Sequence, residues 1–202
     1  MKIVYFDIHV IYDKTTFNKI IEKMKSFNYS GLCVSLEEKD LKFKNDILEL
    51  CKDNLLEFKS RYDLDFEDYR KNKSIKELKK KFNYISLKNV NWNKMNPVNL
   101  RNISILEMDI IPNILIRKIS KSAKHIVFEF NLSNFNKTLE TNPQNAMKQI
   151  HTLMNVQKSN LTIKLSNGAQ HPLDIKPPLQ LLYTYQKLIG AKEEDKKYIG
   201  KI

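Results

Sequence analysis

The sequence contains few glycines and few cysteines. Four glycines occur in 202 residues, namely Gly31, Gly168, Gly190 and Gly200. They are too widely spaced to form G-x-x-x-x-G-K-[ST] or G-x-G-x-x-G, so the common nucleotide-binding loops are excluded. The two cysteines, Cys33 and Cys51, are isolated, which excludes a C-x-x-C motif and a disulfide framework. We therefore expect two reduced thiols and a cytoplasmic location.

Long apolar segments are also absent. No apolar run approaches the ~18 residues that a membrane-spanning helix needs. The N-terminal segment 1–10 carries Asp7 and His9 within its apolar stretch and lacks a small-residue cleavage site. We therefore expect it to be a first strand and not a signal peptide, and we expect no membrane partner.

Acidic residues are outnumbered by basic residues. Lys and Arg total 35 against 23 Asp and Glu, which gives a formal net charge of +12. This balance favours a polyanionic partner, either nucleic acid or an anionic membrane surface. Arginine is scarce and occurs as Arg61, Arg70, Arg101 and Arg117. Because a planar guanidinium makes paired contacts that an ammonium group cannot, these arginines are more informative than the lysines.

Apolar or alternating segments predict seven strands separated by helices. The predicted strands span 3–10, 31–36, 55–60, 84–87, 103–108, 126–130 and 161–165. Strict alternation of strands and helices predicts an α/β fold with a parallel sheet covered by helices. The periodicity leaves a closed TIM-like barrel and an open doubly wound sheet as alternatives. The first turn, 10–14, lacks the glycine that an open nucleotide-binding sheet usually carries.

The last predicted strand leads into a polar turn and then a helix. Ser166-Asn167-Gly168-Ala169 breaks the strand pattern, and Gly168 is free to adopt a positive φ. Pro177-Pro178 is suited to the first turn of the next helix. Gly190 stands where a glycine commonly ends a helix.

This strand, turn and helix resemble ribonuclease P protein component 3. In that family a strand ending in Ser-Ser-Gly-Ala or a similar sequence leads through a short loop to a leucine-rich helix ending at Leu-Gly. Three further segments are similar to the same family: Phe6–Val10 resembles its first strand, Tyr29–Val34 its second, and Glu129–Ser133 its Glu-Ile-Asn-Leu-Ser sequence. The segment 62–101 matches poorly.

The resemblance implies a (β/α) barrel of about seven parallel strands over 1–190, with a charged tail at 191–202. It relates this barrel to metal hydrolases of the polymerase-and-histidinol-phosphatase type. It implies an RNA-binding subunit of ribonuclease P, a ribonucleoprotein endonuclease whose RNA matures the 5′ ends of tRNA precursors with Mg²⁺. The implied partners are ribonuclease P RNA, pre-tRNA and ribonuclease P protein component 2, in a heterotetramer with two copies of each protein. The protein would supply no catalytic residue and bind no cofactor or metal.

Two alternatives come from other functional classes. A metal-dependent phosphoesterase on the same barrel would use polar residues in or after the strands, drawn from Asp7, His9, Glu37, Glu107, Asp109 and Glu129. The related hydrolases begin with His-x-His, whereas this chain has Asp7-x-His9, so one imidazole is missing. The simpler interpretation is that Asp7, His9 and Glu129 hydrogen-bond to one another across the barrel. A scaffolding module with incidental charge is the other alternative.

The candidate RNA contacts are basic residues near strand ends and loops: Arg61, Lys88, Arg101, Arg117, Lys164 and Lys176. A lysine inside a strand, as Lys164 is, either pairs with Glu129 or Asp7 or reaches a phosphate. Other lysines, at 79–81, 118, 121 and 124, lie on or after helices and are expected to be merely solvated. Because no aromatic–basic RNA-recognition signature is present, contacts should be mainly to phosphates and shape.

Overall fold

Seven parallel strands form one sheet in which each strand pairs with the next strand along the chain. The computed structural model describes residues 5–71 and 74–190. The strands are β1 (Phe6–Ile11), β2 (Gly31–Ser35), β3 (Glu57–Asp65), β4 (Tyr84–Lys88), β5 (Ile105–Glu107), β6 (Val127–Asn131) and β7 (Thr162–Ser166).

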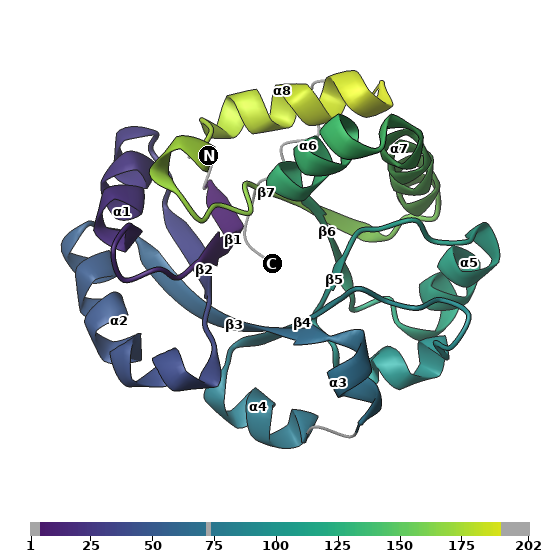
Figure 1. Ribbon diagram of the computed structural model, residues 1–202, viewed down its shortest axis with the longest axis horizontal. Helices are drawn as coiled ribbons and strands as arrows, with labels where there is room; N and C mark the ends of the chain where they lie inside the picture. The colour runs from purple at the N-terminus through teal and green to yellow at the C-terminus, as the bar shows by residue number, and fades with distance from the viewer. Residues whose placement is uncertain (1–4, 72–73, 191–202) are drawn as a thin grey trace.

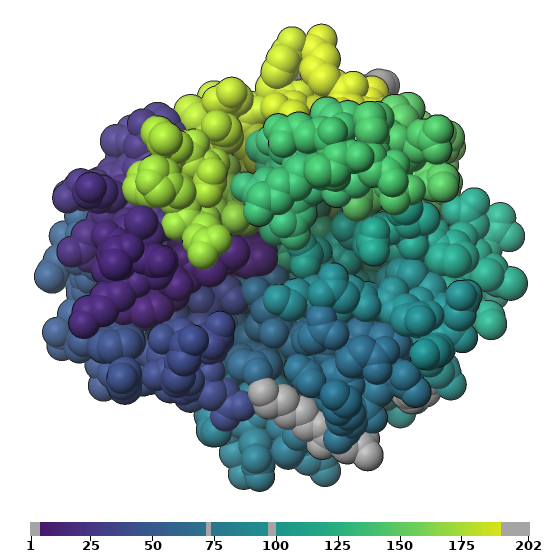
Figure 2. Space-filling view, in the orientation of Figure 1, coloured from purple at the N-terminus to yellow at the C-terminus, as the bar shows by residue number. Residues whose placement is uncertain are grey.

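The last strand returns to the first, so the sheet is a nearly closed barrel (Figure 1). Val10 forms a parallel bridge with Ala169, and the backbone N–H of Ile11 donates to the carbonyl of Ala169 at 2.8 Å. The segment that follows β7 lies against the N-terminal segment, as Figure 2 shows in yellow-green and purple, and the Thr16 hydroxyl donates to the Gln170 carbonyl at 3.1 Å. The predicted TIM-like barrel is confirmed, and the open sheet is excluded.

The helices surround the strands (Figure 1). They are α1 (Phe17–Ser26), α2 (Lys44–Asp53), α3 (Phe66–Arg70), α4 (Ile75–Lys81), α5 (Asn113–Ser122), α6 (Leu132–Thr141), α7 (Pro143–Lys158) and α8 (Pro178–Ile189). Three 3₁₀ segments are η1 (Glu38–Phe43), η2 (Pro97–Asn102) and η3 (Pro172–Asp174). Helical spacing of apolar residues explains the packing: α1, for example, buries Phe17, Ile20, Ile21 and Met24 against the sheet. Among the described helices, none is long and apolar enough to cross a membrane.

The interior of the barrel has an apolar part and an ionic part. The main core lies between sheet and helices, while Phe6, Ile8, Cys33 and Val127 form a separate small apolar cluster. Two residues beyond Val127 along β6, the interior is occupied by charged side chains around Glu129. Interior layers of side chains are the usual filling of such barrels, but here one layer is ionic.

Two differences from the sequence-based expectation affect the site. β3 continues to Asp65, whereas the apolar pattern predicted an end at Ser60, so Arg61 lies inside the strand and not after it. The helix α6 was not predicted, because it buries few apolar residues and begins directly at the strand end, where Asn131 caps it by accepting from the N–H of Asn134. The predicted tail at 191–202 lies outside the described residues.

Candidate functional site

Arg61 is the centre of the ionic layer, which consists of His9, Arg61, Asp63 and Glu129. Its side chain is 0% exposed. It contacts residues of β1, β4 and β6, of which only β4 is next to β3 in the sheet. Nη2 lies 2.7 Å from Asp63 Oδ1, Nη1 lies 2.9 Å from Glu129 Oε2, and the same guanidinium donates to the Ile8 carbonyl and the Ser86 hydroxyl at 2.9 Å each. Because β1, β4 and β6 lie on different sides of the barrel, these contacts place the guanidinium in its interior.

His9 lies between the same two carboxylates. Its Nδ1 is 2.7 Å from Glu129 Oε1, and its Nε2 is 3.2 Å from Asp63 Oδ2. The second contact is an ion pair that is poorly aligned as a hydrogen bond. The hydroxyls of Ser166 and Ser35 donate to Glu129 at 2.6 Å and to Asp63 at 2.5 Å. Each of the two carboxylates is thus held by the side chains of Arg61 and His9 and by one serine hydroxyl.

An irregularity in β1 separates Asp7 from His9. Asp7 pairs with Leu32 and Val10 with Val34, so β1 has one residue more than β2 between these positions. The backbone N–H of His9 donates to Asp7 Oδ1 at 3.0 Å. Such bulges change the direction of neighbouring side chains. As a result His9 contacts the β3 and β6 carboxylates, while Asp7 contacts the turn after β7.

The turn after β7 is built around Asn167. Its side-chain amide donates to Asp7 Oδ2 at 2.6 Å and to the Tyr29 hydroxyl at 2.9 Å, and its Oδ1 accepts from the N–H of Lys176 at 2.9 Å. Gly168 follows with φ of +63°, which confirms the predicted left-handed glycine. Asp7 and the turn at Asn167-Gly168, which are distant in the sequence, are thus joined in one hydrogen-bonded structure.

The charges of the ionic layer stabilise one another. Burial opposes the charge on Glu129, but Arg61 and then His9 lower the pKa of its carboxyl group to about 2. Burial likewise opposes the charge on Asp63, and the same two cations lower its pKa well below the usual value. Burial and Arg61 oppose protonation of His9, yet Glu129 and Asp63 raise its pKa to about 10. The layer therefore holds two anions and two cations at neutral pH.

Two other buried groups differ from this layer. Burial raises the pKa of Asp7 to about 6, against the opposing hydrogen bond from Asn167. Burial also raises the pKa of the Cys33 thiol. A thiol that stays protonated is a poor nucleophile, so Cys33 is unsuited to covalent catalysis.

We expect the stability of the fold to decrease as the pH rises from neutrality to about 10. His9 has an ordinary pKa of 6.5 and a folded pKa of about 10, so its contribution is complete below pH 6.5 and is lost as pH rises through 10. Between these values the folded state binds one more proton, which corresponds to a slope of about −1.4 kcal/mol per pH unit.

Denaturant unfolding between pH 7 and 9.5, compared with His9→Gln, tests this slope. The variant should be less stable at pH 7 but should lack the His9 contribution to the slope. The imidazole resonances of His9 should remain those of an imidazolium at pH 8. A neutral ring at that pH, or equal slopes in both proteins, would contradict the assignment.

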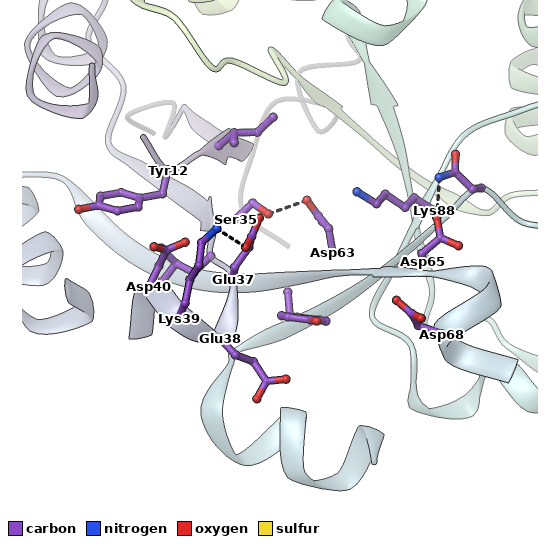
Figure 3. Close-up of a pocket in the computed structure, with 14 residues that line it drawn as sticks. Tyr12, Ser35, Glu37, Glu38, Lys39, Asp40, Asp63, Asp65, Asp68 and Lys88 are labelled. Atoms are coloured by element: carbon purple, nitrogen blue, oxygen red, sulfur yellow. Dashed lines mark hydrogen bonds and ion pairs between the residues drawn. The ribbon is translucent and has the colours of Figure 1, made fainter. Parts of the chain in front are cut away.

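A cleft of about 590 Å³ opens beside this layer, at the ends of β1 to β4. Figure 3 shows carboxylates from three segments around it: Glu37, Glu38 and Asp40 follow β2, Asp63 and Asp65 belong to β3, and Asp68 lies on α3. Two lysines, Lys39 and Lys88, also line it. The cleft is therefore acidic, although the chain as a whole carries +12. It would repel a phosphate backbone.

The structure separates the predicted RNA contacts into three groups. Arg61 and Lys164 are buried, with Lys164 only 8% exposed and paired in register with Glu129. Their assignment as RNA contacts is corrected, because a phosphate of RNA cannot reach side chains that the protein buries. Lys88 lines the acidic cleft. Of the others, Arg101 and Arg117 are exposed and Lys176 is partly buried.

The predicted metal ligands do not form one cluster: His9 and Glu129 are in contact, but the others have separate partners. Glu37 is paired with the exposed Lys39 at 2.8 Å, Glu107 accepts from Asn134, and Asp109 lies 3.5 Å from the Gln149 amide. Asp63, which the sequence did not single out, instead joins His9 and Glu129. The sequence feature that could have indicated Asp63 is the spacing of Arg61, Asp63 and Asp65, because residues two apart on a strand lie on the same face.

A divalent metal does not fit this donor set. Asp63 and Glu129 are already bridged by the Arg61 guanidinium, and its positive charge between the two carboxylates opposes a divalent cation at the same place. In the part of the chain that the structure describes, no group of three or more His, Cys, Asp or Glu side chains is placed to hold a metal ion.

Comparisons with known proteins address the fold. No protein-family model matches the chain, and no curated protein matches it. A solved structure, a probable 2-pyrone-4,6-dicarboxylic acid hydrolase from Acinetobacter baumannii with citric acid bound, superposes with a TM-score of 0.51. The alignment covers 96% of each chain at 10% sequence identity. This likeness shows the barrel fold alone.

Proposed function

We propose that this chain is a non-catalytic, RNA-binding subunit of ribonuclease P. In this proposal the RNA cleaves tRNA precursors, with Mg²⁺ bound to RNA, and the protein screens the repulsion between phosphates. A second protein, ribonuclease P protein component 2, completes the heterotetramer. In this proposal the barrel acts in the cytoplasm, where it binds RNA and catalyses no reaction.

The observation that carries the proposal is that the resembling segments contact one another. Asp7, from the segment that resembles the first strand of the family, bonds to Asn167 in the Ser-Asn-Gly-Ala turn. Tyr29, which begins the second such segment, bonds to the same Asn167. Glu129, which begins the third, accepts from Ser166 at 2.6 Å. Four short resemblances that meet in one hydrogen-bonded unit support a common origin better than four unconnected ones.

The ionic layer supports a non-catalytic role. Enzymes with this fold place reactive groups at the C-terminal ends of the strands. Here the charged groups at that position neutralise one another: Arg61 and His9 hold Asp63 and Glu129. This arrangement disfavours the metal-dependent phosphoesterase, because its candidate ligands are already engaged.

Purification of the tagged chain from its native cells tests the proposal. We expect enrichment of ribonuclease P RNA and of tRNA precursors with 5′ extensions over an untagged control. In a reconstituted enzyme, the protein should lower the Mg²⁺ concentration that pre-tRNA cleavage requires, because it neutralises phosphates that Mg²⁺ otherwise screens.

Two results would contradict the proposal. One is recovery of no RNA above the control. The other is stoichiometric Zn, Mn or Fe in the purified protein together with phosphodiester hydrolysis that His9→Ala abolishes, which would favour the hydrolase. The control is Arg70→Ala, which removes one exposed positive charge on α3 and should leave RNA recovery unchanged.

A further inference from the structure

A second pocket lies at the opposite ends of β6 and β7 from the ionic layer. It has a volume of about 490 Å³ and is lined by Ser120, Lys121, Lys124, Ser159, Asn160 and Leu161. The first three residues are at or just after the end of α5, and the last three follow the end of α7. The pocket thus combines two lysines, two hydroxyls and an amide. The Ser120 hydroxyl already donates to the Arg117 carbonyl at 2.8 Å, so the two lysines are the main donors for phosphate oxygens.

The two helices that form the pocket carry charge of one sign. The sequences of α5 and α7 contain Arg117, Lys118, Lys121, Lys148 and Lys158 and no Asp or Glu. The helices are neighbours: the Asn155 amide donates to Asn113 Oδ1 at 2.7 Å. In contrast, α1 and α2 carry Glu22, Asp46, Glu49 and Asp53 beside their lysines.

The backbone of the helices does not account for this charge. The C-terminus of a helix carries about half a negative charge, which one lysine in the last turn compensates. Two helix ends therefore require about one positive charge in total. The pocket region has four exposed lysines: Lys118, Lys121, Lys124 and Lys158. These lysines carry more positive charge than the two helix ends require, and the excess is available to an anionic ligand.

The neighbouring surface extends the positive region. η2 packs against α5, and its Arg101 is exposed. Arg117 lies one residue before Lys118 on α5 and is also exposed. Two of the predicted RNA contacts thus belong to this side of the barrel, whereas Lys88 lies in the acidic cleft.

We propose that this pocket and the lysines around it, which we call the α5–α7 basic surface (Lys118, Lys121, Lys124 and Lys158), bind the phosphate backbone of RNA. The inference rests on the proposed function and assigns its binding face. The barrel would then meet RNA at the N-terminal ends of β6 and β7, away from the strand ends at which enzymes of this fold bind substrates. A membrane surface fits less well, because such binding buries exposed apolar side chains, and the apolar residue of this pocket, Leu161, is itself buried.

Two triple variants with equal loss of charge test the proposal. The first removes part of the surface: Lys121→Ala, Lys124→Ala and Lys158→Ala. The control, Lys79→Ala, Lys80→Ala and Lys81→Ala, lies at the end of α4, where Lys81 pairs with Glu38 at 3.2 Å. Binding of ribonuclease P RNA and of a generic RNA duplex is measured across a range of salt concentrations, and circular dichroism checks folding.

We expect the first variant to bind both RNAs on the order of tenfold more weakly near 0.15 M salt, with a salt slope lower by about 2. The control should change each value much less. Equal effects would show that only net charge matters and would overturn the binding surface. Lysine-dependent binding to anionic vesicles without RNA binding would overturn it as well.

The two proposals fail separately. If the wild type binds the duplex through these lysines but does not prefer ribonuclease P RNA, the binding surface stands and the ribonuclease P assignment fails. If it prefers ribonuclease P RNA and the first variant binds as the control does, the assignment stands and this surface is wrong. Binding of neither RNA would overturn both.

Discussion

Replacing Arg61 with alanine is expected to lower the free energy of unfolding by about 3–5 kcal/mol. The substitution would leave Asp63 and Glu129 buried with one cation, His9, in place of two. It would also remove the donors to the Ile8 carbonyl and the Ser86 hydroxyl. A buried carboxylate without its partner is far more costly than a lost surface contact.

Denaturant unfolding of Arg61→Ala and of Arg101→Ala provides the comparison. Arg101 is exposed on η2, so its loss should change stability by less than about 0.5 kcal/mol. Arg61→Lys should recover part of the stability, because an ammonium group keeps the charge but cannot contact both carboxylates in the same geometry. If Arg61→Ala unfolds like the wild type and instead binds RNA more weakly, Arg61 is a surface contact and the ionic layer is wrongly described.

The barrel was predictable from the sequence because its strands follow local patterns. Segments such as Gly31–Ser35 are short, largely apolar and separated by amphipathic helices. The closure of the sheet was not predictable from periodicity, since an open sheet has the same pattern. It depends on the parallel bridge between Val10 and Ala169, which lie 159 residues apart in the sequence.

The ionic layer was predictable only in part. Asp7, His9 and Glu129 were identified as polar residues on strands, and their engagement in hydrogen bonds was the simpler of the two interpretations. Arg61 was placed after the end of its strand and Asp63 was not singled out, because charged residues are rarely buried. They are buried here because each compensates the other and because β6 supplies Glu129. Such compensation depends on residues distant in the sequence, which no local pattern reports.

The distribution of charge could not be read from composition. The net charge of +12 suggested that the chain binds a polyanion but not where. The fold gathers Glu37, Asp63, Asp65 and other carboxylates around one cleft, whereas α5 and α7 carry lysines and one arginine but no carboxylate. Lys121 and Lys124, which looked like ordinary solvated residues on a helix, acquire a role only through the pocket that they share with Ser159 and Asn160.

Gly168→Val is expected to destabilise the fold by about 2–4 kcal/mol. The backbone at Gly168 has φ of +63°, where a β-branched residue costs about 1–3 kcal/mol. A Cβ atom there would also stand 2.1 Å from Asn131 Oδ1. Asn131 caps α6 by accepting from the N–H of Asn134 at 3.1 Å, so its displacement costs about 1 kcal/mol more.

Gly190→Val is the matched control, since Gly190 has φ of +67° and nothing within 4 Å of an added Cβ atom. It should cost about 1–3 kcal/mol, from backbone strain alone. The difference between the two variants measures the collision with Asn131. In an Asn131→Ala background this difference should shrink, because the colliding amide is gone and the two sites are coupled. Equal losses at both glycines would mean that Asn131 moves aside freely. An unchanged melting temperature for Gly168→Val would mean that the turn is ordinary, and the resemblance carried by Ser166 to Ala169 would then lose its structural basis.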